Sequence, residues 1–162
     1  MTVKSVLKDE QALTMTVTAE FDAAIDAVWQ LWADPRKLER WWGPPTHPAT
    51  VVDHALVEGG RVTYFMTGPE GDRFHGWWRI GSVDAPNAFE FEDGFADEAG
   101  APNPDLPTTQ AQVTLDINAS GRTRMVITTT FASLDAMQEL VKMGMEEGIT
   151  MALGQADALL VT

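Results

Sequence analysis

Between residues 49 and 131 the sequence repeats one pattern that largely dictates the fold. Short runs of alternating apolar and polar residues are each closed by a Gly-, Pro- or Asn-containing turn. A period of two predicts β-strands that bury one face. The predicted strands are residues 49–57, 61–67, 74–83, 88–95, 110–117 and 123–131. Because most links between them are short, we predict that consecutive strands pair as an antiparallel meander.

The segments that flank this meander carry a further strand and three helices. Residues 13–21 alternate like the other strands. Residues 25–32 have the apolar spacing of an amphipathic helix, and Asp34-Pro35 ends it and caps a second short helix. From Ser133, a good N-cap, to about Leu160 the pattern predicts one long helix. The expected fold class is therefore α+β, with a seven-stranded antiparallel sheet covered by the C-terminal helix.

Four tryptophans occur within the two short helices. Trp29 and Trp32 are expected to be core residues of the first helix. Trp41 and Trp42 precede a rigid Gly-Pro-Pro stop, and we expect one of the two to face the core and the other to line a pocket or a docking surface.

The composition limits what this protein can do. The chain has 162 residues, 44% of them hydrophobic, which predicts a single domain over residues 1–162. The net charge of −13 disfavours nucleic acid and anionic membranes as partners, and no apolar run is long enough for membrane insertion. The N-terminal residues lack the apolar segment of a signal peptide, so we expect a cytoplasmic location.

The motifs of common enzymes are missing from the sequence. It has no cysteine, no G-x-S-x-G, no P-loop and no G-x-G-x-x-G. His47, His54 and His75 lack metal-ligand spacing, so we predict neither a metal nor a cofactor. By alternation His75 and Arg79 lie opposite Trp78, and we expect them to face solvent. The alternative turns them inward, beside Tyr64, as acid–base groups.

Other acidic residues are expected to be solvated. Glu90 and Glu92 alternate with Phe89 and Phe91 and should lie on the outer face of their strand. The acidic residues from Asp93 to Asp105 are expected to belong to a solvated loop. Most of them fall in a long Gly- and Pro-rich link over residues 94–107.

Several of these stretches together resemble one family. They are Val28-Trp29, Asp34-Pro35, Trp41 to Pro44, Gly76, Asn103 to Pro107 and Met143 to Gly148. Over residues 12–160 the chain is similar to the homologues of the activator of the heat-shock-protein-90 ATPase, within the START-like (SRPBCC, helix-grip) superfamily. The resemblance implies a curved sheet that grips the long helix around an apolar cavity, with the two short helices near its mouth.

One departure from the family pattern predicts a large cavity. After Gly148 the family usually carries Trp, and seven positions later Leu, where this chain has Ile149 and Ala156. Gly144 and Gly148 cost about 1 kcal/mol each inside a helix, which suggests either a close approach to the sheet or a cavity left by the missing side chains. We therefore expect a cavity between the sheet and the C-terminal helix.

Two functions follow from this cavity. The first is non-catalytic binding of a small hydrophobic molecule, with a chaperone or other protein as a second class of partner and a link to the stress response or to a chaperone ATPase. The second is a cyclase- or dehydratase-like enzyme acting on a polyketide-like substrate. Two or more ionisable groups in the cavity would favour the enzyme. The expected ligand-binding residues are Trp41, Trp42, Tyr64, Trp78, Phe91, Met145 and Ile149.

Overall fold

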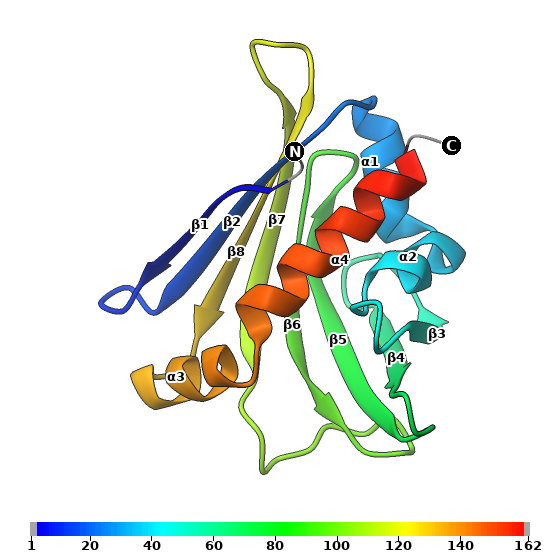
Figure 1. Ribbon diagram of the computed structural model, residues 1–162, viewed down its shortest axis with the longest axis vertical. Coiled ribbons are helices and arrows are strands. Elements are labelled where there is room, and N and C mark those ends of the chain that lie inside the picture. Colours follow the sequence, from blue (N-terminus) through cyan, green and yellow to red (C-terminus); the bar gives the residue numbers. More distant parts are fainter. Residues whose placement is uncertain (1–2, 161–162) are drawn as a thin grey trace.

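The computed structural model describes residues 3–160 and consists of one antiparallel sheet with helices on one side (Figure 1). The strands are β1 (Val3–Asp9), β2 (Thr14–Phe21), β3 (Ala49–His54), β4 (Arg61–Thr67), β5 (Arg73–Asp84), β6 (Ala88–Ala96), β7 (Thr109–Ile117) and β8 (Thr123–Phe131). The helices are α1 (Ile25–Ala33), α2 (Pro35–Trp41), α3 (Leu134–Lys142) and α4 (Met145–Leu160).

The sheet confirms the predicted meander. Its strand order is β1-β2-β8-β7-β6-β5-β4-β3, so the six strands from β3 to β8 are neighbours in the order in which they follow along the chain. Every neighbouring pair is antiparallel. The strand β2 pairs with β8, which places residues 14–21 next to residues more than 100 positions later in the chain.

The prediction of seven strands was wrong by one, because β1 also joins the sheet. This strand pairs only with β2, and its register shifts between Val3 and Ser5. The shift interrupts the alternation that identifies a strand in the sequence. Charged residues at Lys4, Lys8 and Asp9 are typical of an exposed edge.

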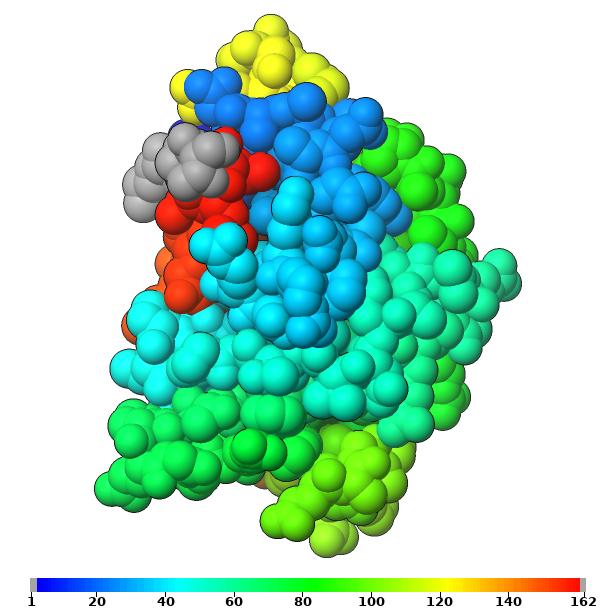
Figure 2. Space-filling model, turned by 90° about the vertical axis from the view of Figure 1, so that its right-hand side faces the viewer, coloured from blue at the N-terminus to red at the C-terminus, as the bar shows by residue number. Residues whose placement is uncertain are grey.

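The two short helices begin and end where the sequence predicts. The carboxylate of Asp34 accepts a hydrogen bond from the Arg36 N–H at 2.9 Å, and Pro35 occupies the first helical position of α2. This cap satisfies one of the backbone donors that the first turn of a helix leaves free. Figure 2 shows α1 and α2 side by side between the C-terminal part of α4 and strands β3 and β4.

The prediction of one continuous C-terminal helix was wrong. Ser133 caps α3 as expected, its hydroxyl accepting from the Ala136 N–H at 3.1 Å, but the helix ends at Lys142. Gly144 has a φ of +94°, a left-handed conformation that glycine adopts without a steric penalty. The chain therefore turns there, and α4 begins at Met145 and crosses the face of the sheet obliquely (Figure 1).

The core lies between α4, the two short helices and the inner face of the sheet. Its largest fully buried side chains include Trp32, Trp41, Trp78, Phe21 and Phe89. This arrangement of a curved sheet around a C-terminal helix is the expected helix-grip fold. Within residues 3–160, no helix is long and apolar enough to cross a membrane.

Candidate functional site

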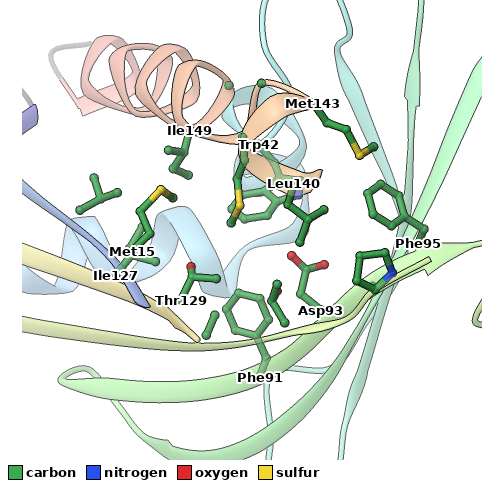
Figure 3. A pocket seen from close by; sticks show the side chains of 18 of the residues that line it. Met15, Trp42, Phe91, Asp93, Phe95, Ile127, Thr129, Leu140, Met143 and Ile149 are labelled. Carbon is green, nitrogen blue, oxygen red and sulfur yellow. The ribbon is translucent and has the colours of Figure 1, made fainter. Parts of the chain in front are cut away.

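A cavity of about 330 Å³ lies between the inner face of the sheet and the junction of α3 and α4 (Figure 3). The break at Gly144 shapes it, since residues from both helices form one wall and Gly144 itself contributes to the lining. Its apolar lining comes from the sheet through Met15, Val17, Phe91, Phe95, Ala111 and Ile127, and from the two helices and the turn between them through Leu140, Met143, Met145 and Ile149.

The structure brings five of the seven predicted binding residues to this cavity. They are Trp42, Tyr64, Phe91, Met145 and Ile149. Trp41 and Trp78 lie outside the lining. Trp41 is fully buried and donates its indole N–H to the Leu31 carbonyl at 2.8 Å. Trp78 is covered by Phe91, whose ring stacks on it at a centroid distance of 4.3 Å.

The dense tryptophan segment forms an aromatic cluster behind the cavity. Trp32 is at its centre, with ring centroids 4.8 Å from Trp41 and 5.2 Å from Phe89. Trp29 packs edge-on against Phe89 at 5.6 Å. These contacts confirm that Trp29 and Trp32 are packing residues. Edge-to-face and stacked pairs each add about 0.5–1.5 kcal/mol beyond the burial of their area.

Trp42 connects this cluster to the cavity. Its ring lies 5.5 Å from Trp41 on one side and 6.3 Å from Tyr64 on the other. The prediction that the two adjacent tryptophans face different ways is therefore confirmed, with Trp41 in the core and Trp42 at the cavity. Successive residues of a helix point about 100° apart, which is why one position can be buried while the next lines a space.

Three polar groups meet where Trp42, Trp78 and Tyr64 pack together. The buried indole N–H groups of Trp42 and Trp78 have no acceptor with hydrogen-bond geometry among residues 3–160. Both nevertheless face the Tyr64 hydroxyl closely enough to lower its pKa in part. Burial has the larger, opposite effect and raises the pKa of Tyr64 far above its ordinary value of 10.0, and the charge of Asp93 raises it further. Tyr64 is therefore a neutral hydrogen-bonding group.

The expectation that Asp93 belongs to a solvated loop was wrong. Asp93 lies within β6, and its carboxyl points into the cavity between Phe91 and Leu140 (Figure 3). Burial in these apolar surroundings raises the pKa of Asp93 from 3.8 to about 7, and a hydrogen bond with the Gly94 backbone offsets part of that rise. A carboxyl of this kind can hold or release a proton near neutral pH.

The sequence did contain a signal for this residue. Phe89 and Phe91 alternate with Glu90 and Glu92, so the next inward position of the same strand is residue 93. The predicted strand over residues 88–95 already included this position, but the acidic residues that follow Asp93 led us to assign it to a solvated loop. In the structure β6 continues to Ala96, and the loop begins only after it.

His75 and Arg79 face away from the cavity, as expected. The Arg79 side chain is 71% exposed and lies 3.8 Å from Glu92 on the outer face. His75 packs against Phe65 on that same face, with ring centroids 5.6 Å apart. The inward alternative for these two residues is therefore wrong. Among the described residues, no group of three or more His, Asp or Glu side chains is placed to hold a metal ion.

The small residues of α4 have two different environments. Gly148 and Ile149 line the cavity, and a Cβ added at Gly148 would meet no atom within 4 Å. Gly148 therefore leaves open space, as inferred from the sequence. Ala156 is fully buried in the core and does not line the cavity, so its small size serves close packing instead.

Comparison with known proteins agrees with this architecture. The family model described as "Activator of Hsp90 ATPase homolog 1-like protein" matches residues 22–160. The crystal structure of protein Ms6760 from Mycobacterium smegmatis is 52% identical, with a TM-score of 0.90, covering 98% of this chain and 96% of that one. A protein from Arthrobacter aurescens, solved by NMR, is 51% identical, with a TM-score of 0.93 and coverages of 99% and 92%.

A more distant relative has the same fold. The NMR structure of a protein from Staphylococcus epidermidis is 26% identical, with a TM-score of 0.84, covering 97% of this chain and 93% of that one. No functionally curated protein matches the chain.

Proposed function

Because the chain belongs to the activator of Hsp90 ATPase homolog 1-like family, we propose that it binds a small hydrophobic molecule, without catalysis, in the cavity between the sheet and helices α3 and α4. The supporting observation is the lining itself. It consists mainly of Met, Leu, Ile, Val and aromatic side chains around a space of about 330 Å³. Ligand pockets of proteins typically start near 300 Å³ and are lined mostly by apolar groups with a few polar ones.

The test is a binding titration with naphthalene-2-methanol, a neutral apolar molecule, followed by tryptophan fluorescence. We expect the probe to quench emission, since the Trp42 ring lines the cavity. Trp42→Phe should lose most of this response. Trp77→Phe is the matched control, because the Trp77 ring lies over Gly94 on the other side of the sheet, its N–H donating to the Phe95 carbonyl at 3.0 Å.

Two results would argue against this function. Unchanged emission in the wild-type protein across a panel of such probes, together with unchanged NMR shifts for Ile149 and Met145, would mean that the cavity takes no apolar ligand. An equal loss of response in Trp42→Phe and Trp77→Phe would place the binding site elsewhere.

The second candidate is a cyclase- or dehydratase-like reaction on a hydrophobic polyketide-like substrate. Two ionisable groups, Asp93 and Tyr64, line the cavity, which is the feature expected of an enzyme. A carboxyl whose pKa is about 7 suits a general base, and the neutral Tyr64 hydroxyl suits a hydrogen-bond donor to a developing oxyanion.

This candidate is tested by mass spectrometry of polyketide-like substrates incubated with the protein, looking for loss of water or ring closure. Asp93→Asn should abolish turnover and leave substrate binding intact. If no substrate turns over, or if the variant is as active as the wild-type protein, this mechanism does not apply.

A link to a chaperone ATPase or to the stress response is a subordinate proposal. It comes from the family description, whereas the ligand proposal comes from the cavity of this chain. Its test is the ATPase rate of purified Hsp90 with and without the protein, and an unchanged rate would remove it. A cytoplasmic location remains a prediction from the sequence.

A further inference from the structure

The cavity contains a single group that can carry charge near neutral pH. Asp93 and Tyr64 are the ionisable side chains among its lining residues, and the lining includes no Lys, Arg or His. Tyr64 stays neutral because burial raises its pKa. A ligand with a carboxylate or phosphate would therefore meet no cation in the cavity and would be repelled by Asp93.

Among the residues that the structure describes, the Asp93 carboxyl has no cationic partner. The ion pairs within residues 3–160 join Lys8 to Glu146, Arg36 to Glu39 and Arg79 to Glu92, and none of them includes Asp93. Its side chain projects from the floor of the cavity toward the helices (Figure 3). A partly buried carboxylate without a counter-ion is a site that a positively charged ligand group would satisfy.

The surroundings of Asp93 also suit a cation. The rings of Phe91 and Phe95 flank it on the same face of β6, and Trp42 and Tyr64 line the adjacent wall. Aromatic faces within about 6 Å attract ammonium groups, most strongly where water is excluded. The net charge of −13 further favours the approach of cations.

From this arrangement we infer that the cavity binds hydrophobic amines, with the protonated amino group at the Asp93 carboxylate and the apolar part directed toward Met15, Ile127 and Ile149. This inference rests on the proposed ligand-binding function and narrows it to one chemical class. In Figure 3 the three apolar side chains lie on the side of the cavity away from Phe95, so the polar and apolar parts of such a ligand have separate places.

The experiment compares three probes that share a phenyl ring and a four-carbon chain: 4-phenylbutylamine, 4-phenylbutan-1-ol and 4-phenylbutanoate. Affinities are measured by calorimetry and NMR titration at about pH 8, where Asp93 is mostly ionised and the amine is protonated. We expect the amine to bind at least about tenfold more tightly than the alcohol, the factor typical of a charge-assisted hydrogen bond, and the carboxylate to bind most weakly.

Asp93→Asn should remove this order of affinities, since the charge is lost with little change in shape. The affinity for the amine should then lie within about threefold of the affinity for the alcohol. Glu92→Gln is the matched control. It removes the neighbouring carboxylate, which lies on the outer face beside Arg79, and the order of the three probes should be retained.

The possible results separate this inference from the function on which it rests. Equal binding of all three probes, or tightest binding of the alcohol or the carboxylate, would overturn the amine inference while leaving ligand binding in place. Binding of none of the probes would overturn both. Preference for the amine that persists in Asp93→Asn would also overturn the inference, because Asp93 would then not be the recognition site.

Discussion

The side chain of Tyr64 covers Gly76 on the neighbouring strand so closely that a Cβ added at residue 76 would lie 2.4 Å from the Tyr64 hydroxyl oxygen. The two residues are direct partners in the pairing of β4 with β5. Glycine at position 76 therefore allows Tyr64 to lie flat against the sheet, next to Trp42 and Trp78. The packing of Tyr64 with Trp42 and Trp78 therefore depends on the absence of a side chain at residue 76.

Gly76→Ala should consequently lower the free energy of unfolding by about 1–3 kcal/mol, the range for overpacking a core. Tyr64 cannot simply move aside, because Trp42 and Trp78 pack on its ring. Gly81→Ala on the same strand is the control, since its Cβ would meet the exposed, flexible side chain of Glu90. Urea denaturation of both variants measures the difference, and equal stabilities would contradict the role of Gly76.

Ile149→Trp and Ala156→Leu should have different effects on stability. Ile149 lines the cavity, so the larger ring can occupy empty apolar space, leaving stability unchanged or raised and weakening ligand binding. Ala156 is fully buried in the core, where the added methyl groups should cost about 1–3 kcal/mol. Thermal melts and ligand titrations check this. Clear destabilisation by Ile149→Trp would mean that the cavity cannot take more volume.

Asp93 should contribute more to the stability of the protein at mildly acidic pH than at or above neutral pH. Between about pH 4 and 7 the folded protein keeps the proton on Asp93, whose pKa is about 7, whereas the unfolded chain has released it. The free energy of unfolding therefore falls as pH rises through this range, by at most about 1.4 kcal/mol per pH unit. Above this pH range Asp93 is ionised in both the folded and the unfolded state and no longer makes the unfolding free energy depend on pH.

The measurement is the difference in unfolding free energy between the wild-type protein and Asp93→Asn from about pH 4 to 8. The groups that face Asp93 from the other lining elements do not titrate in this range, since Tyr64 remains neutral and the rest carry no ionisable side chain. Glu92→Gln serves as the control for a carboxyl on the outer face. Parallel pH curves for the wild-type protein and Asp93→Asn would show that Asp93 is solvated.

Two glycines of the C-terminal helices should respond differently to alanine. Gly144 has a φ of +94°, so Gly144→Ala should destabilise the protein by about 1–2 kcal/mol. Gly154 lies inside α4 with no atom within 4 Å of an added Cβ, and Gly154→Ala should stabilise by about 0.5–1 kcal/mol. Chemical denaturation distinguishes them. A stabilising effect at position 144 would indicate a continuous helix.

Much of the fold could be predicted from the sequence because its causes are local. Alternating side chains define the strands β2 to β8, and the Asp34-Pro35 and Ser133 caps define where helices α2 and α3 begin. The period of two and the helix caps each depend on residues that are close together in the sequence. For the same reason the alternation of β6 already placed Asp93 on the inner face, although the acidic residues after it obscured this.

Only the tertiary structure decided the remaining features, because their causes lie far away in the chain. Edge strand β1 exists through its pairing with β2, and its irregular register conceals it in the sequence. Gly144 is compatible with a helix or with a turn, and the cost of about 1 kcal/mol for a helical glycine is small enough for packing to choose the turn.

The cavity belongs to this second group. Trp41 and Trp42 are adjacent residues of the same type, yet Trp41 is enclosed by the core and Trp42 faces an open space. The reason is that successive side chains of a helix point about 100° apart. The raised pKa of Asp93 likewise arises from residues of several strands and helices that remove water from around one carboxyl. A single sequence lists these residues, but only the folded chain determines which of them surround the same space.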